Sequence, residues 1–143
     1  MVNINMRSIL VLNSKGGSGK TTIATNLASF FASVGKSVAL VDLDAQQSSI
    51  SWLKARSSAK PPIIGIKGYG EKVKRGIDYK IIDAPAGLQG AALTKVLNMA
   101  ESVIIPVLPS PIDMRAAEDF IKNIKKHSRV VKKKSKIALV ANR

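Results

Sequence analysis

The chain contains no cysteine, one histidine and few aromatic residues, which make up 4% of its 143 positions. The lack of cysteine excludes disulfides, thiolate metal sites and iron–sulfur clusters. Long apolar runs are also missing, because no stretch approaches the roughly 18 residues that a membrane span needs. The first residues show no charged-then-apolar leader. We therefore expect a cytoplasmic protein with no membrane partner.

Acidic residues are scarce beside basic ones, since nine Asp and Glu stand against 23 Lys and Arg, a formal net charge of +14. An excess of this size favours a polyanionic partner. Hydrophobic residues make up 45% of the chain, and with so few aromatics the core should consist of Val, Ile, Leu and Ala. Such a core is typical of buried parallel strands covered by helices. We expect an α/β fold and one domain over residues 1–143.

A glycine-rich stretch of sequence KGGSGKTT lies between an apolar run, residues 9–12, and a helical pattern that continues to Ser33. Its glycines allow the backbone to approach a polyphosphate closely, and the helix that follows directs unpaired N–H groups and its positive dipole end to the same place. Lys20 supplies a charge for the terminal phosphates, and the Thr21 hydroxyl can ligate magnesium. The alternative is a flexible turn that binds nothing. The stretch predicts a nucleoside triphosphate cradle made of Gly16, Gly17, Ser18, Gly19, Lys20, Thr21 and Thr22.

Two more apolar runs lead into aspartates. One follows residues 37–41 and continues into Asp42 and Asp44, and the other ends at Asp83. Ligands bind at the carboxyl edge of an open parallel sheet, so we expect these carboxylates beside the phosphate cradle. Asp83 would reach a magnesium ion through water, although an aspartate after a strand is often only a turn residue. Asp44 could alternatively form a capping box with Gln47 at the start of a helix over 46–56.

The cradle departs from the strict pattern G-x-x-x-x-G-K-[ST], because Ser14 stands five positions before Gly19 and Lys15 is an additional lysine. This deviant form resembles the Walker A motif of the ParA/MinD family of P-loop ATPases. Two later segments resemble the switch motifs of that family: DLDAQ at 42–46, in which alanine replaces the usual proline, and DAPAG at 83–87. The run PSPID that precedes Met114 resembles small plasmid-type ParA partition proteins.

The resemblance extends from Ser8 to Arg143 and implies a three-layer P-loop NTPase fold, with a mostly parallel sheet and helices on both faces. It implies ATP and Mg²⁺ as cofactors and a homodimer in the ATP state, in which Lys15 reaches the partner's nucleotide. It also implies that Asp44 positions the attacking water or assists the magnesium shell, that Gly87 moves toward the γ-phosphate, and that Asn142 contacts adenine. Family members continue past Asn142, so we expect the C-terminal part of the fold to be missing.

The remaining pattern predicts helices over Gly90–Ala100 and Met114–His127, with Asp113 as the N-cap of the second, and a helical turn over 71–75. Strands are expected at 63–66, 102–108 and 137–141. Helical spacing also predicts which apolar side chains face the core. They are Ile23, Leu27, Phe30 and Phe31 in the first helix, Leu93, Val96, Leu97 and Ala100 in the third, and Met114, Ala117, Phe120, Ile121 and Ile124 in the last.

The excess of basic residues is concentrated near the end of the chain, where eight of fifteen residues are Lys or Arg and none is acidic. We expect nonspecific contact with the nucleic-acid backbone, although such a run is often only a solvated face. No aromatic residue interleaves the lysines, so base stacking is not supported. The DNA-binding candidates are Lys122, Lys125, Lys126, Arg129, Lys132, Lys133, Lys134 and Lys136.

Together these features predict a nucleoid-associated ATPase of DNA or cargo partition, which hydrolyses ATP slowly and, by the resemblance, answers to a ParB-like activator. Two alternatives stay open. One is a non-catalytic DNA-binding remnant that has lost the nucleotide cycle. The other is a small-molecule kinase or an enzyme like cobyrinic acid a,c-diamide synthase, which would need an acceptor site in the sheet-edge loops.

Overall fold

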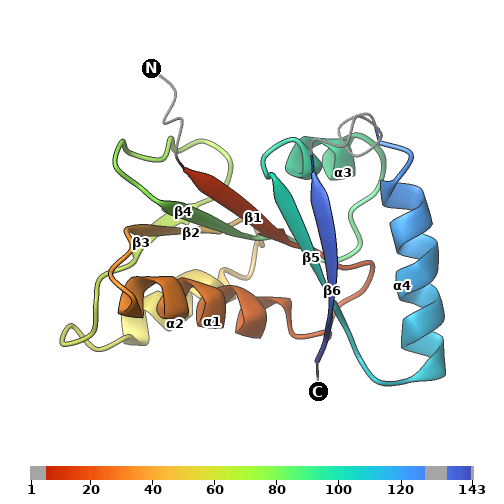
Figure 1. Cartoon of the computed structure of the whole chain (residues 1–143), viewed down its shortest axis with the longest axis horizontal. Helices are drawn as coiled ribbons and strands as arrows, with labels where there is room; N and C mark the ends of the chain where they lie inside the picture. Colours follow the sequence, from red (N-terminus) through yellow and green to blue (C-terminus); the bar gives the residue numbers. More distant parts are fainter. Residues whose placement is uncertain (1–5, 128–134, 143) are drawn as a thin grey trace.

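Six strands lie side by side in one parallel sheet, in the order β3-β2-β4-β1-β5-β6 (Figure 1). The computed structural model describes residues 6–127 and 135–142, and all statements about elements refer to these. In chain order the elements are β1 (Arg7–Val11), α1 (Lys20–Ser33), β2 (Val38–Asp42), α2 (Ser48–Ala55), β3 (Ile64–Lys67), β4 (Tyr79–Asp83), α3 (Gly90–Leu97), β5 (Ser102–Val107), α4 (Pro111–Ile124) and β6 (Lys136–Ala141). The α/β class is confirmed.

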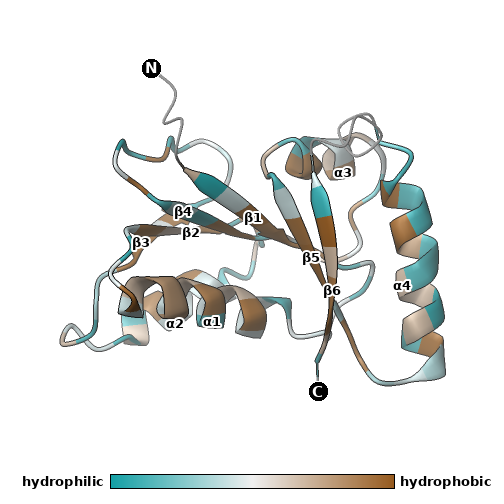
Figure 2. Cartoon of the chain, in the orientation of Figure 1, coloured by the Kyte–Doolittle hydropathy of each residue, from teal (hydrophilic) through white to brown (hydrophobic). Residues whose placement is uncertain are grey.

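The helices cover both faces of the sheet, so the expected three layers are present (Figure 1). Helices α1 and α2 pack on one face, where Ala24, Ala28 and Ala32 meet Val38, Leu40 and Ile81. Helices α3 and α4 pack on the other, where Leu93, Val96, Leu97, Phe120 and Ile124 meet Leu10, Val41 and Ile82. Figure 2 shows the apolar colour along the central strands and a polar outer face on α4. Strands buried on both faces need continuous apolar runs, and the sequence supplies them.

The parallel register brings the carboxyl ends of β1, β2 and β4 together. Asp42 at the end of β2 pairs with Asp83 at the end of β4, and Asp83 pairs with Val11 at the end of β1. The loop after β1 is the predicted phosphate cradle. Because β4 lies between β1 and β2, both switch segments begin beside that loop.

The core face of α1 differs from the prediction. Of the residues that helical spacing predicted, Ile23, Leu27 and Phe31 are partly buried and pack against this core cluster, but Phe30 is 57% exposed. The most deeply buried positions of the helix are instead alanines 24, 28 and 32. Alanines four residues apart lie on one face of a helix and allow it to approach the strands closely. The bulky residues therefore lie to the side, where Phe31 stacks on Tyr79 with ring centroids 3.8 Å apart.

The prediction that Asp113 caps the last helix is wrong. Helix α4 begins at Pro111, and its N-cap is Ser110, whose hydroxyl accepts a hydrogen bond from the Asp113 backbone N–H at 3.1 Å. Proline suits the first helical position because its φ is already helical and it has no N–H to satisfy. The helix thus starts three residues earlier than predicted, and Met114, expected in the core, is 56% exposed.

Two other local predictions are also wrong. Helix α2 begins at Ser48 rather than at residue 46. Its N-cap residue is Gln47, which has a left-handed φ of 52° and whose own side chain accepts no hydrogen bond from the helix. The Asp44–Gln47 capping box is therefore absent. Residues 71–75 form no helix. Among the described residues, no helix is long and apolar enough to cross a membrane.

Candidate phosphate site at the carboxyl edge of the sheet

The loop between β1 and α1 forms one wall of a cavity of about 370 Å³ at the carboxyl edge of the sheet. Gly17 and Gly19 adopt left-handed φ of 78° and 88°, which only glycine reaches without strain. Helix α1 starts at Lys20, and no side chain in the described part of the chain caps it. Its first-turn N–H groups therefore stay available to an anion. The cavity is lined by Gly16, Gly17, Gly19, Lys20, Thr21, Thr22, Asp44, Gln46, Ser48 and Ala86.

The Ser18 hydroxyl is buried and has no hydrogen-bond partner among the described residues. Buried hydroxyls are almost always paired, so the unpaired Ser18 hydroxyl marks the loop as a place where a further polar group, a ligand or a water molecule, completes the hydrogen bonding. Beside it, Lys20 is 9% exposed, which leaves a nearly buried ammonium without an ion-pair partner in the same described set. An anionic group with several acceptor oxygens, such as a polyphosphate, satisfies both. The residues present fit a nucleotide's phosphate tail.

Asp83 accepts two hydroxyl hydrogen bonds on a single oxygen, Oδ2. Thr21 donates from the first turn of α1 at 2.8 Å, and Ser49 donates from α2 at 2.5 Å. Burial raises the pKa of Asp83 above its ordinary value, and the hydrogen bonds from Ser49 and Thr21 oppose that rise. The structure thus places Asp83 beside Thr21, and its service to a magnesium ion stays a prediction. Such a hydroxyl and carboxylate can hold Mg²⁺ together with phosphate oxygens and water.

Ser49 escaped the sequence analysis because it belongs to no motif and is one of two consecutive serines. The only available signal was its position just after the first switch segment. The fold buries it completely against Asp83. It therefore ties the start of α2, and with it the loop that carries Asp44, to the end of β4.

Asp42, the last residue of β2, and Asp44, two residues further on, have different roles. Asp42 is buried, and its carboxylate accepts from the backbone N–H groups of Asp44 at 3.0 Å and Ile50 at 3.1 Å. It thus performs the capping of α2 that the sequence attributed to Asp44. Asp44 lines the cavity, and its Oδ1 accepts from Gln46 N–H at 3.0 Å. Its other carboxylate oxygen makes no hydrogen bond within the described residues and is available to a ligand.

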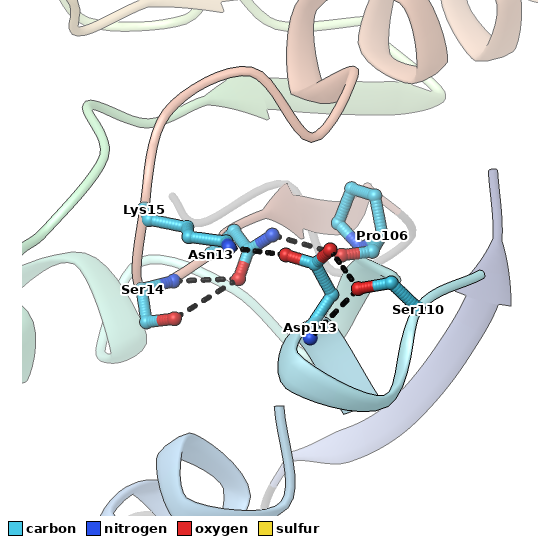
Figure 3. A network of polar contacts seen from close by, with 6 residues as sticks. All are labelled: Asn13, Ser14, Lys15, Pro106, Ser110 and Asp113. Atoms are coloured by element: carbon cyan, nitrogen blue, oxygen red, sulfur yellow. Dashed lines mark hydrogen bonds and ion pairs between the residues drawn. The ribbon is translucent and has the colours of Figure 1, made fainter. Parts of the chain in front are cut away.

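Lys15, the additional lysine of the loop, forms an ion pair with Asp113 of its own chain (Figure 3). The Lys15 side chain is 49% exposed, and that of Asp113 is 15% exposed. Asp113 also accepts from the Ser110 hydroxyl. The hydrogen bonds from Lys15 and from Ser110 both lower the pKa of Asp113. In the single chain, the front of the phosphate loop is therefore tied to the first turn of α4.

Two asparagines fix the loop from behind. Asn13 is buried, donates from Nδ2 to the Pro106 carbonyl at 2.9 Å and accepts from Ser14 N–H at 2.6 Å (Figure 3). Asn142 donates from Nδ2 to the Ser18 carbonyl at 3.0 Å. A Cβ on Gly19 would stand 1.9 Å from Asn142 Nδ2 and would displace that amide, and the φ of 88° favours glycine at this position. Asn142 thus contacts the loop, and whether it also contacts adenine stays a prediction.

The remaining predicted residues fall outside this cavity. Gly87 lies behind the loop, where its N–H donates to the Asn13 carbonyl at 3.3 Å and a Cβ on it would meet the Ser14 carbonyl at 3.6 Å. Lys122, Lys125 and Lys126 are exposed on and just after α4, and Lys136 is exposed at the start of β6. The candidates Arg129, Lys132, Lys133 and Lys134 lie outside the described residues.

A second hollow of about 430 Å³ lies between α4 and β6. Its walls are mostly apolar and include Val107, Met114 and Leu139, so it offers little to an anion. Phosphate chemistry therefore belongs to the smaller, polar cavity. Among the described residues no cluster of three or more His, Cys, Asp or Glu could hold a metal ion, so an ion here needs ligand oxygens as well.

A parallel sheet with helices on both faces and a glycine loop at the amino end of α1 defines an α/β nucleotide-binding protein of the P-loop class. Residues 9–143 match the family described as the CobQ/CobB/MinD/ParA nucleotide binding domain, and the chain belongs to that family. The expected kinship with ParA and MinD is confirmed.

Among curated proteins, the maintenance of carboxysome distribution protein A of Halothiobacillus neapolitanus is 32% identical over 144 residues, covering 94% of this chain. The chain spans only 65% of that relative's length. Among solved structures, pNOB8 ParA bound to nonspecific DNA has a TM-score of 0.74 at 19% identity, covering 96% of this chain and 68% of that one. MinD of Pyrococcus horikoshii complexed with Mg-ADP has a TM-score of 0.74 at 21% identity, covering 96% and 70%. At these identities the two structures establish the shared fold.

Proposed function

We propose that the protein is an ATP-dependent partition ATPase, which dimerises around ATP, binds DNA without sequence preference and hydrolyses the nucleotide slowly to reset the cycle. Its cargo is a plasmid, a chromosome or another large assembly. One observation carries the proposal: the glycine loop holds an orphaned Ser18 hydroxyl and a buried Lys20 next to the Thr21–Asp83 pair. The relative that distributes carboxysomes and the ParA structure with nonspecific DNA support the assignment.

The chain's own residues would share the work at the nucleotide as follows. The loop N–H groups and Lys20 bind the phosphates, and Thr21 and Asp83 hold the magnesium ion. Bound magnesium neutralises charge on the phosphates during transfer. Asp44, on the cavity wall, orients the attacking water. Ser49 keeps Asp83 in place through its hydrogen bond.

Dimerisation would place Lys15 against the nucleotide of a second chain. Within the described part of one chain, no arginine lines the cavity, so a stabilising cation for the transferred phosphate must come from elsewhere. Lys15 directly precedes Gly16 of the cavity wall, and its side chain is half exposed. Slow hydrolysis in the absence of an activator follows, because this lysine reaches a phosphate only in the assembled pair. A ParB-like activator would then accelerate the step.

DNA binding would use the exposed lysines of α4, Lys122, Lys125 and Lys126, together with the basic residues that follow them. Lys122, Lys125 and Lys126 lie apart from the phosphate cavity, so one molecule can hold ATP and DNA at once. The contact would place the protein on the nucleoid in the cytoplasm.

The test is sedimentation of the purified chain with a nonhydrolysable ATP analogue and magnesium, with and without duplex DNA. We expect the analogue to produce dimers and to tighten DNA binding. DNA binding that ignores the nucleotide would instead establish a DNA-binding remnant. In a parallel incubation with ATP itself, a phosphorylated small molecule in place of free phosphate would establish a kinase. No binding of the analogue by folded protein would refute the proposal.

The ion pair between Lys15 and Asp113 leads to a prediction about assembly. It holds Lys15 within its own chain, so the Asp113→Asn variant should dimerise at about two- to fivefold lower nucleotide concentration, the scale of a partly exposed ion pair. The measurement is the dimer fraction during nucleotide titration. Asp119→Asn, the same charge change at an exposed position of α4, serves as the control. A higher threshold for Asp113→Asn would show that Asp113 assists Lys15 instead of restraining it.

A further inference from the structure

Tyr69 and Lys95 meet on the surface although 26 positions separate them in the chain. Tyr69 follows β3 and is 43% exposed, and Lys95 belongs to the last turn of α3. The Lys95 ammonium stands 4.0 Å from the centroid of the Tyr69 ring. This is a cation–π contact, which orients an ammonium group without cancelling its charge.

The charge of Lys95 is therefore available to an anion. In the described ranges the single ion pair is that of Lys15 with Asp113, so no carboxylate neutralises Lys95. A salt bridge would hold the lysine equally well but would offer an approaching phosphate a neutral pair. An aromatic ring presents the same lysine preoriented and fully charged.

Lys95 also lies next to the basic end of α4. Its neighbour Thr94 shares a hydrogen bond of 2.8 Å with Nδ1 of His127, the residue that follows Lys125 and Lys126. Figure 1 shows α3 beside the C-terminal end of α4. The loop between β3 and β4 belongs to the same layer, because Val73 and Ile77 pack into the core that α3 and α4 cover.

These three segments form one basic surface, hereafter the α3 surface. It consists of the loop 68–76, helix α3, the C-terminal half of α4 and the two residues that follow α4. The acidic residues of these segments are Glu71, Glu118 and Asp119. Arg75 lines a hollow beside the end of α1 and is not counted here. The exposed basic residues that remain are Lys72, Lys74, Lys95, Lys122, Lys125 and Lys126, six against three acidic ones. A surface with this balance attracts a polyanionic backbone.

We propose that the α3 surface binds the phosphate backbone of DNA, with Lys95 as a direct phosphate contact and Tyr69 as the residue that positions it. The proposal rests on the DNA binding proposed above and extends it beyond α4 to α3 and the β3–β4 loop.

The test is the affinity for a short mixed-sequence duplex, measured by fluorescence anisotropy with the ATP analogue and magnesium at salt concentrations between about 50 and 200 mM. Lys95→Gln should weaken binding about fivefold and lower the slope of log K against log salt by about 0.9, the value of one phosphate contact. Tyr69→Leu should weaken binding about two- to fivefold at an unchanged slope, since the charge remains and its orientation is lost. Tyr69→Phe should match the wild type.

The control is Lys54→Gln, the same charge change at an exposed position of α2, on the opposite face of the sheet. Thermal melting and binding of a fluorescent ATP analogue verify that each variant is folded. If Lys95→Gln and Lys54→Gln give equal affinities and slopes while the wild type binds DNA, the α3 surface is refuted and the proposed function stands. If the wild type binds ATP but no duplex, both proposals fail.

Discussion

Replacing Lys20 by alanine should lower the affinity for magnesium-ATP by about two orders of magnitude. Lys20 is 9% exposed at the start of α1 and lines the cavity. A charge-assisted hydrogen bond in such a place contributes about 1.5 to 3 kcal/mol, and the upper value corresponds to about 100-fold in binding. Isothermal titration calorimetry measures the loss directly.

The same variant distinguishes ATP-driven DNA binding from DNA binding that is independent of the nucleotide. If ATP drives DNA binding, Lys20→Ala should bind duplex as weakly with ATP as the wild type does without it. Lys36→Ala is the control, because Lys36 is exposed just before β2 at the opposite edge of the sheet. Undiminished ATP affinity in folded Lys20→Ala protein would move the nucleotide away from the glycine loop and remove the main support for the proposed function.

Replacing Asp44 by asparagine should slow ATP hydrolysis by about 100-fold or more and leave ATP binding within a few fold of the wild type. A carboxylate that orients or activates water contributes about 10² to 10⁴ to the rate. Asparagine keeps the oxygen that accepts from Gln46 N–H, so the local turn should survive. Phosphate release under single-turnover conditions, with DNA present, measures the step.

Asp78→Asn is the matched control for this variant. Asp78 Oδ2 also accepts a backbone hydrogen bond, from Ser37 N–H at 2.8 Å, but at the amino edge of the sheet. Both substitutions remove one carboxylate and keep one accepted hydrogen bond. Equal hydrolysis by Asp44→Asn and the wild type would assign Asp44 a purely structural part in the loop after β2.

The motifs could be located from the sequence because their signals are local. A glycine loop between an apolar strand and a helix, and aspartates at strand ends, depend only on neighbouring residues and on the geometry of a parallel sheet. The positions of Lys20, Thr21, Asp44 and Asp83 around one edge agree with that geometry. The chain's membership of the ParA/MinD family agrees as well.

Other features needed contacts between distant segments, and sequence reasoning missed them or placed them wrongly. The capping of α2 passes from Asp44 to Asp42 because the end of β2 lies under the first turn of that helix. Phe30 was assigned to the core by helical spacing, yet alanines on the adjacent face of the helix make the closest contact with the sheet. Ser49 had no motif to mark it.

Composition and local pattern were sufficient for the fold class, the strands and the phosphate loop, because backbone preferences and apolar periodicity act over a few residues. Which polar and charged side chains meet across the chain was decided only by the tertiary structure. Lys15 pairs with Asp113, Ser49 with Asp83, and Lys95 lies on Tyr69, each across long stretches of sequence. Such pairings follow from the order of strands in the sheet and the packing of helices upon it, and no short-range signal encodes either.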